Sequence, residues 1–473
     1  MMKNRLLPIL ALAFTICVAP VAALAEMAVP RSTAEITLSF APVVKSTAKS
    51  VVNVYTRKVV AERRFSPFGN DPFFRRFFDR GGPFGSVPRN RVQRSLGSGV
   101  IVDDTGVIVT NEHVVKGADD ITVVLSDKRE FDAKVMLRDP RTDLAILQID
   151  PGGSTLEALP LRDSDEISVG DLVLAIGNPF GVGQTVTNGI ISAVGRTEVN
   201  KADYQFYIQT DAAINPGNSG GALVDMAGNL IGINTAIFSR SGGSNGIGFA
   251  IPANMVRTVV RSALSGDEAV QRPWAGASLQ EVTSDLAESL GLDRPRGALI
   301  RAMVDESPLQ KAGLKVGDVL LTIDKHEIEN SREFISRFTS RPLGSTVRVK
   351  YMRGGKVRAS QVNLVAAPEN TPRNETLIEG DNPFSGLKVA NLSPAVADEL
   401  QIDPRETGVV VMKLDPGSVA RNVGFRRGDI IKKVNRDDVN MVEDLQRAAE
   451  DDPRKWVVTV KRRGRTSTFR LRY

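Results

Sequence analysis

The chain has 473 residues, of which 42% are hydrophobic and 25% are charged. This composition is that of a folded globular protein, and the length allows about three domains of ~150 residues each. The net charge of +6 is modest for this length, and the single cysteine, Cys17, excludes a fold that depends on disulfide bonds.

Residues 1–25 have the pattern of a cleavable export signal. Lys3 and Arg5 precede an apolar run over residues 6–18, and Ala23-Leu24-Ala25 has the small residues of a cleavage site. The apolar run is shorter than the ~20 residues of a membrane span, which favours cleavage over a retained anchor. The sequence therefore predicts export, and no later segment is long and apolar enough to span a bilayer.

Residues 36–50 have the pattern of an amphipathic helix that leads into a strand at residues 51–55. Residues 58–95 then interleave phenylalanines with arginines between prolines and glycines, which predicts a long loop. Exposed phenylalanines usually mark a contact surface. The loop either folds back onto its own domain or contacts a neighbouring subunit. Binding of single-stranded nucleic acid, a third use of such a pattern, is disfavoured by export.

From residue 96 to residue 250, short apolar runs end at glycine, aspartate or asparagine turns, as in β-barrels. His113 follows one such run, Asp143 opens another, and Ser219 lies further on in Gly217-Asn218-Ser219-Gly220-Gly221. A serine hydroxyl becomes a nucleophile when an imidazole takes its proton and a carboxylate orients the imidazole. The three residues therefore predict the triad of a serine hydrolase.

The glycines around the serine fit acyl-transfer chemistry. Gly217 allows backbone N–H groups to point at the oxyanion that forms in the transition state. Gly220 and Gly221 are expected to leave room for the backbone of a substrate. The pentapeptide alone could also be a plain turn between strands, but His113 and Asp143 upstream favour catalysis.

After a helix predicted at residues 254–265, the chain contains an internal repeat. Residues 307–320 match residues 418–431 in a small-Gly-hydrophobic-x-x-Gly-Asp-hydrophobic pattern. A unit of this length that occurs twice indicates two copies of one small domain. Gly313 and Gly424 are expected to cap helices within these copies.

The basic residues near the end of the chain alternate with Phe469 and Leu471, which predicts a half-buried strand. Attraction to acidic lipid headgroups is the alternative, so membrane contact is expected to be peripheral at most.

These motifs resemble the chymotrypsin-like protease domain of the HtrA family, and the whole chain resembles its periplasmic serine endoproteases of the DegP/DegQ type, which have two PDZ domains. The matching segments are Gly97-Ser98-Gly99-Val100-Ile101, the segments of His113, Asp143 and Ser219, Gly177-Asn178-Pro179-Phe180-Gly181, Gln209-Thr210-Asp211-Ala212-Ala213-Ile214-Asn215, Gly232-Ile233-Asn234-Thr235-Ala236-Ile237 and Gly248-Phe249-Ala250-Ile251-Pro252. The internal repeat resembles bacterial PDZ domains.

The resemblance implies a mainly β fold, with a chymotrypsin-like double β-barrel of two six-stranded barrels followed by two PDZ domains. The expected divisions are a signal peptide at 1–25, a protease domain at 26–265 with the long loop 58–95, a first PDZ domain at 270–365, a linker at 366–382 and a second PDZ domain at 383–473.

The resemblance also implies the roles of individual residues. Catalysis is expected from His113, Asp143 and Ser219, in the cleft between the barrels, with an oxyanion hole from the N–H groups of Gly217, Asn218 and Ser219. Ile214 and Ile237 are expected to wall an S1 pocket that favours Val, Ala or Ile, since neither pocket stretch contains an acid that would select Lys or Arg. The segment Asn234-Thr235-Ala236 is expected to pair with the substrate as an antiparallel strand.

A PDZ groove binds an extended peptide as an added strand and captures its terminal carboxylate on a loop of N–H groups. The resemblance places these loops at Ala275, Gly276 and Ala277 in the first copy and at Ser385, Gly386 and Leu387 in the second. Alternatively, Gly276 and Gly386 serve only the backbone of these loops, since each of them opens a strand, and they bind no ligand. Arg196 lies at the position of a sensor loop that couples PDZ binding to the protease site.

The expected function is serine endopeptidase activity in the periplasm that degrades unfolded or misfolded exported proteins and is regulated by C-terminal peptides, with holding-chaperone activity alongside. A non-proteolytic chaperone or PDZ scaffold is the alternative, which the intact triad argues against. The family implies homotrimers and larger cages. We expect no cofactor or metal, because the sequence has neither a metal-ligand cluster nor a phosphate-binding loop. We expect no nucleic-acid partner, because the protein is predicted to be exported. The chain departs from close relatives at Pro216, where they carry a basic residue, and lacks the cysteine pair of the long loop.

Overall fold

The computed structural model describes residues 39–60, 91–178, 183–196, 206–237, 244–450 and 455–472. The predicted export signal and most of the predicted loop 58–95 lie outside these residues. Within the described ranges, none of the helices combines the length and the apolarity that crossing a membrane requires.

The first sheet of the protease region has seven strands, in the order β5-β4-β1-β2-β3-β7-β6. Its strands are β1 (Val51–Val60), β2 (Arg91–Asp103), β3 (Val107–Thr110), β4 (Asp120–Val124), β5 (Glu130–Asp132), β6 (Lys134–Asp139) and β7 (Leu144–Gln148). We expected six strands in this sheet, and it has seven. The predicted helix before it is shorter than expected, with an α-helix α2 (Ala41–Thr47) and a 3-10 turn η1 (Ala48–Ser50).

The second sheet closes into the predicted six-stranded barrel, in the order β10-β13-β12-β11-β8-β9. Its strands are β8 (Leu172–Gly177), β9 (Thr185–Arg196), β10 (Tyr207–Thr210), β11 (Ala222–Asp225), β12 (Leu230–Ile237) and β13 (Gly248–Pro252). Branched side chains fill its interior, among them Ile191, Ile208 and Ile231. β-branched residues suit such a pleated, buried surface, which is why the short apolar runs of the sequence form strands here.

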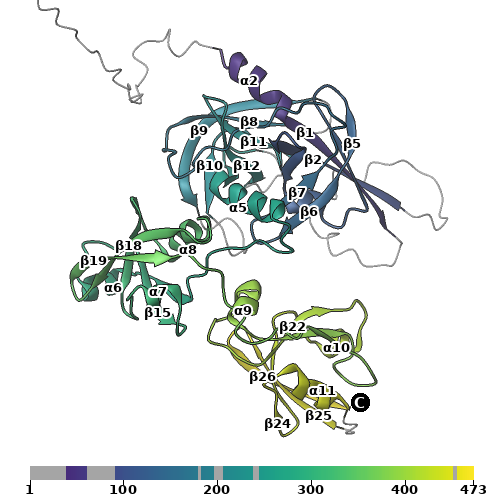
Figure 1. The fold of residues 1–473 in the computed structure, drawn as a ribbon, viewed down its shortest axis with the longest axis vertical. Coiled ribbons are helices and arrows are strands. Elements are labelled where there is room, and N and C mark those ends of the chain that lie inside the picture. Colours follow the sequence, from purple (N-terminus) through teal and green to yellow (C-terminus); the bar gives the residue numbers. More distant parts are fainter. Residues whose placement is uncertain are drawn as a thin grey trace, which may run out of the picture. The chain divides into compact units, whose positions relative to one another are not determined.

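Helix α5 (Ala253–Leu264) leaves the barrel as predicted and packs across strands of both sheets, with β6 and β7 on one side and β12 and β13 on the other (Figure 1). Buried Met255, Val256 and Val259 form its inward face. This helix therefore fixes the two sheets of the protease domain against each other.

The first PDZ-like domain is a sheet of order β14-β15-β16-β18-β19, with β17 paired to β16. Its strands are β14 (Ala277–Glu281), β15 (Ala298–Met303), β16 (Val319–Ile323), β17 (His326–Glu327), β18 (Thr346–Arg353) and β19 (Lys356–Asn363), and its helices are α6 (Ser284–Leu290), α7 (Pro308–Lys311) and α8 (Ser331–Thr339).

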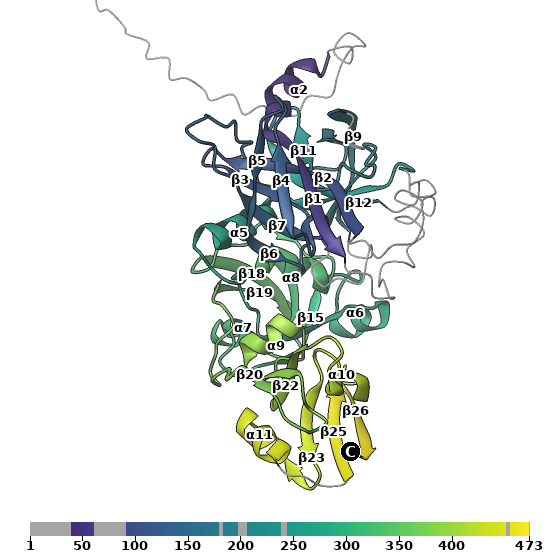
Figure 2. The ribbon, with the colours of Figure 1, turned by 90° about the vertical axis from the view of Figure 1, so that its right-hand side faces the viewer.

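The second PDZ-like domain repeats this topology element by element, in the order β21-β22-β23-β25-β26 with β24 paired to β23. Its strands are β21 (Leu387–Asn391), β22 (Val409–Leu414), β23 (Ile430–Val434), β24 (Asp437–Asp438), β25 (Lys455–Arg462) and β26 (Arg465–Arg472), and its helices are α9 (Pro394–Leu400), α10 (Val419–Val423) and α11 (Val442–Glu450). Figure 2 shows α11 beside the sheet of β23, β25 and β26. The basic tail thus forms strands, as predicted.

One element has no counterpart in the first copy. Strand β20 (Thr376–Ile378) pairs with β21 at the edge of the second sheet. The sequence placed these residues in a linker at 366–382, so the last part of that linker belongs to the second domain.

The repeated Gly-Asp motif builds the same buried ion pair in each copy. Asp318 accepts two hydrogen bonds from Arg353, both at 2.6 Å, and Asp429 accepts two from Arg462, at 2.6 and 2.7 Å. The aspartates are 1% and 0% exposed, so each buried charge depends on its bidentate arginine. Both glycines expected to cap helices adopt the left-handed conformation: Gly424 ends α10, and Gly313 follows α7 directly after its capping residue Ala312.

Replacing Asp429 by Ala should destabilise the second PDZ-like domain by about 1.5–3 kcal/mol, because it removes a buried carboxylate that accepts hydrogen bonds from Arg462 and from the N–H of Arg426. Calorimetric unfolding of the full chain measures the effect, with Arg465→Ala on the exposed strand β26 as the control. A variant that unfolds at the parental temperature would show that the ion pair does not hold this domain together.

Candidate active site

His113 and Asp143 meet where β3 and β7 lie side by side. The short helix α4 (Glu112–Val115) follows β3 and carries His113, and Asp143 immediately precedes β7. The Nδ1 atom of His113 lies 2.7 Å from Oδ2 of Asp143, and the backbone N–H of His113 donates to Oδ1 at 3.0 Å. The carboxylate therefore holds both the ring and the backbone of the histidine. The His113 side chain is 41% exposed, so its outer edge can reach a substrate.

Asp143 adopts a backbone conformation that few residues other than glycine accept, with φ at +58°. Its carbonyl group accepts hydrogen bonds from the N–H of Glu112, at 3.1 Å, and from the side chain of Asn111, at 3.0 Å. Residues held in such a conformation are kept there by their surroundings and are concentrated at functional sites. The fold thus fixes the direction of the Asp143 carboxylate.

Thr235 brings the second barrel to this pair. Strand β12 pairs with β13 through Asn234 and Ala250 and then through Ala236 and Phe249, so the register shifts at Thr235. Such a bulge re-aims the side chain of the extra residue. The Oγ1 atom of Thr235 donates to Oδ2 of Asp143 at 2.8 Å.

Ser219 joins the same network through Thr235. Its hydroxyl donates to the carbonyl oxygen of Thr235 at 3.2 Å. A continuous chain of hydrogen bonds therefore runs from His113 through Asp143 and Thr235 to Ser219. In this arrangement the hydroxyl donates to Thr235, and this hydrogen bond has to break before the proton can pass to His113.

The residues before Ser219 form a turn that suits an oxyanion. The N–H of Asn218 donates to the carbonyl of Asn215 at 3.0 Å, and Gly217 has φ at +102°. This is the geometry of a type II turn, which favours proline and then glycine at its central positions, as in Pro216-Gly217. Pro216 thus favours this turn.

Two N–H groups of this turn are available to an oxyanion. Among the described residues, those of Gly217 and Ser219 have no hydrogen-bond acceptor, whereas that of Asn218 is used inside the turn. The expectation that Asn218 also contributes its N–H is therefore not supported by the geometry.

Ser98, on β2 of the first sheet, braces the nucleophile segment. Its N–H donates to the carbonyl of Ser219 at 2.9 Å, and its hydroxyl donates to the carbonyl of Gly217 at 2.6 Å. A Cβ atom at Gly220 would lie 2.1 Å from the carbonyl oxygen of Ser98, and one at Gly221 would lie 2.2 Å from that of Ile176. These two glycines therefore make room for the protein's own backbone, and the approach of a substrate beside them stays a prediction.

Two further features surround the aspartate. Tyr207 on β10 is buried, and this burial, together with the nearby charge of Asp143, raises the pKa of its phenol to about 12, so that it stays neutral.

Asp139 accepts hydrogen bonds from the hydroxyl of Thr142 and from Arg272. The side chains of Asp139 and Arg272 are each 4% exposed. The segment that carries Asp143 is thus anchored to the chain that enters the first PDZ-like domain.

The predicted substrate-binding residues have different environments. Ile214 is 1% exposed and belongs to the core of the second barrel. Asn234 uses its N–H and its carbonyl on Gly221 and Gly220, so its backbone cannot pair with a substrate as expected. The side chains of Ala236 and Ile237 lie outside the described residues, as does that of Arg196, the last residue of β9.

The two predicted carboxylate loops have the same local geometry. Gly276 and Gly386 have φ at +62° and +85°, and a Cβ atom at either would lie within 2.4 Å of the Cβ of a serine, Ser307 or Ser418. Glycine is therefore structurally required at both positions. Their N–H groups differ: among the described residues, those of Ala275 and Gly276 have no acceptor, whereas Gly386 donates to Ile378 at 2.9 Å.

Sequence reasoning missed Ser98, Tyr207 and the role of Thr235 toward Asp143. Only Ser98 had a signal, because it lies between two glycines in Gly97-Ser98-Gly99. Within the described part of the chain, no group of three or more His, Cys, Asp or Glu side chains could hold a metal ion.

Comparisons with known proteins agree with this geometry. Residues 97–233 match the model of the trypsin-like peptidase domain, and residues 274–364 match the PDZ domain. A probable periplasmic serine endoprotease DegP-like from Pseudomonas putida is 38% identical over 91% of this chain and 93% of its own length. The chain belongs to the HtrA family of DegP-type serine endoproteases.

Other members of the family are similarly close. The periplasmic serine endoprotease DegP of Escherichia coli K12 is 36% identical over 96% of both chains. Among solved structures, the HtrA-type protease AlgW with a tripeptide is 43% identical, with a TM-score of 0.51 over 70% of this chain and 98% of that one. AlgW with a decapeptide is 46% identical, with a TM-score of 0.50 over 70% of this chain and 99% of that one. This HtrA chain is thus a serine endopeptidase with a trypsin-like domain and PDZ domains.

Replacing Thr235 by Val should lower the kcat of peptide cleavage about 10- to 100-fold, because a hydrogen bond to a charged group contributes ~1.5–3 kcal/mol. Thr235→Ser keeps the hydroxyl and should retain most of the activity. Steady-state kinetics on an unfolded protein substrate compares the two variants. Equal activity in Thr235→Val and the parent would mean that Asp143 is oriented without Thr235.

Proposed function

We propose that this HtrA chain degrades unfolded or misfolded exported proteins, with Ser219 as nucleophile, His113 as general base and Asp143 as the residue that orients His113. The observation that carries this proposal is the hydrogen-bond chain from His113 through Asp143 and Thr235 to Ser219. It draws on both sheets of the protease domain, as a site in the cleft between them requires.

The first step is the release of the Ser219 hydroxyl. Strand β12 pairs with β11 only as far as Ile233, so a substrate that runs beside the end of β12 can donate its N–H to the carbonyl of Thr235, which accepts from Ser219 in this structure. The displaced hydroxyl rotates toward Nε2 of His113, to which it gives its proton as Oγ attacks the carbonyl carbon of the substrate. Binding of the substrate thus helps to place the nucleophile.

The charges that develop in this step meet groups that are already in place. The N–H groups of Gly217 and Ser219 receive the oxyanion, and one such donor typically contributes about 3–4 kcal/mol to catalysis. The carboxylate of Asp143 stabilises the imidazolium. His113 then protonates the leaving amine, and water, activated by the same imidazole, hydrolyses the acyl-enzyme to complete the reaction.

The substrate class follows from the need for an extended strand at the site, which unfolded chains offer and folded domains do not. Ile214 and Ile237 remain our proposed walls of the S1 pocket, with a preference for Val, Ala or Ile. Arg196 remains the proposed regulatory residue that links PDZ binding to the protease site.

The proposed location is the periplasm, reached through the signal at residues 1–25. The curated relatives named above are periplasmic endoproteases. The two AlgW structures contain peptides, which supports peptide binding by the PDZ domains. Assembly into homotrimers and larger cages completes the proposal. A purely non-proteolytic chaperone is not favoured, because these relatives are all named as proteases.

Replacing Ser219 by Ala should lower the rate of casein degradation by ~10⁶-fold, because the members of a triad act as a unit. The variant should still bind unfolded protein. Release of labelled peptides measures cleavage, with Ser265→Ala, an exposed serine at the end of α5, as the matched control. Residual cleavage within tenfold of the parent would exclude Ser219 as the nucleophile.

A further inference from the structure

The two PDZ domains differ at the strand where a peptide ligand would add. In the first domain, β14 pairs only with β15 among the described residues, so its outer edge is open. In the second domain, the corresponding strand β21 pairs with β22 on one side and with β20 on the other. The place of an added peptide strand is therefore already taken by residues of the same chain.

Strand β20 runs in the direction that a bound C-terminal peptide would take. It is antiparallel to β21, with Thr376 opposite Val389 and Ile378 opposite Leu387. Its last residue thus lies against the start of β21, directly after the predicted carboxylate loop at Ser385, Gly386 and Leu387. A C-terminal peptide ends at this point in a PDZ groove.

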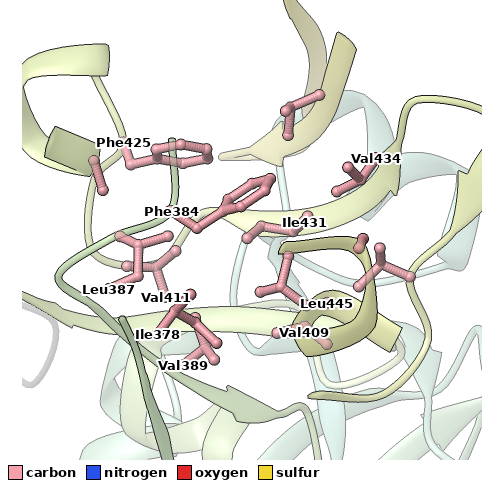
Figure 3. Packing of buried hydrophobic residues seen from close by; sticks show 14 of the residues in the cluster. Ile378, Phe384, Leu387, Val389, Val409, Val411, Phe425, Ile431, Val434 and Leu445 are labelled. Carbon is pink, nitrogen blue, oxygen red and sulfur yellow. The ribbon is translucent and has the colours of Figure 1, made fainter. Parts of the chain in front are cut away.

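Ile378 takes the position of a terminal ligand residue in two respects. Its carbonyl oxygen accepts a hydrogen bond from the N–H of Gly386 at 2.9 Å, as a ligand carboxylate would. Its side chain is 4% exposed and packs in the core of the domain with Leu387 and Val389 (Figure 3). Helix α11 supplies Leu445 to the same core and lies against β20.

The segment before β20 is held along the same groove. The N–H of Asn391 donates to the carbonyl of Arg373 at 2.8 Å, and its side chain donates to the carbonyl of Pro372 at 2.9 Å. Asn374 donates to Glu443 on α11 at 2.6 Å. Residues 372–378 are thus bound by both walls of the groove, β21 and α11.

We propose that residues 372–378 are an internal ligand of the second PDZ domain. The groove recognises an extended segment that ends in a branched aliphatic residue, and it accepts an outside C-terminal peptide of that chemistry only after β20 is released. Because the internal segment is tethered next to the loop, its effective concentration is high, and a free peptide competes at a disadvantage. The first PDZ domain, with its open β14, binds such peptides without this competition.

The inference goes beyond the proposed function, because it concerns peptide binding and does not depend on proteolysis. It is tested in the full chain carrying Ser219→Ala, so that loss of cleavage cannot affect the result. The probe is a synthetic peptide of residues 369–378 with a free C-terminal carboxylate, a fluorescent label at its start and a photoreactive side chain in place of Leu377. Crosslinks mapped by mass spectrometry distinguish binding to the second groove, at 387–391 or 442–450, from binding to the first domain.

Replacing Ile378 by Asp should raise the yield of crosslinks to the second groove at least tenfold over that of the parent. Leu377→Asp is the matched control, because Leu377 lies in the same strand and is 43% exposed, so this variant should behave as the parent does. Equal crosslinking of the second groove in the parent and in Ile378→Asp would overturn the proposal.

An engineered disulfide that can be reduced provides a second test, which applies if the Ile378→Asp variant does not fold. Leu377 and Lys388 face each other across β20 and β21, so cysteines at both positions can join the strands in an Ile378→Ala background. The oxidised protein should crosslink the probe in the second groove at least tenfold less than the same protein after reduction. If the oxidised and reduced forms crosslink equally, release of β20 is not required and the proposal fails.

Discussion

The site depends on Thr235, where a bulge in β12 turns one residue of the second barrel toward the first sheet. The side chain of Thr235 donates to Asp143 and its carbonyl accepts from Ser219, so one residue contacts both the orienting carboxylate and the proposed nucleophile. A regular strand would aim alternate side chains to opposite faces and could not present both groups to the cleft at this position. Ser98 holds the nucleophile segment from the opposite sheet, and His113 and Asp143 are held together within the first sheet.

The two PDZ domains illustrate how one fold can be kept while its binding edge changes. Both copies retain the buried Gly-Asp-Arg arrangement, which holds the sheet to the loop before it. They also retain the glycine that lies against a serine in the carboxylate loop. The difference lies outside the repeated unit, in a three-residue strand of the preceding connection. A short edge strand of this kind satisfies the open N–H and C=O groups that otherwise invite pairing with another chain.

The sequence was sufficient for the main features of the fold. Short apolar runs between turns predicted the barrels, and the repeated Gly-Asp pattern predicted the two small domains. The residue types around His113, Asp143 and Ser219 also pointed to the chemistry, because few other arrangements call for those groups near a Gly-Asn-Ser-Gly-Gly segment. The features that escaped prediction depend on contacts between distant segments. The bulge at Thr235 has no local signature, since neither glycine nor an unusual pattern marks it. Asn218 was expected to serve the oxyanion, but its N–H closes the turn. Residues 376–378 were assigned to the linker because a segment of three residues is too short to show the alternation of buried and exposed side chains that marks a strand.

A crystal structure of the protein after reaction with a peptidyl phosphonate ending in valine tests the central claim most directly. The account predicts a covalent bond from Ser219 to phosphorus, a phosphonyl oxygen held by the N–H groups of Gly217 and Ser219, and the carbonyl of Thr235 accepting the N–H of the valine while its hydroxyl stays on Asp143. An adduct in which Thr235 contacts neither the inhibitor nor Asp143 would contradict it.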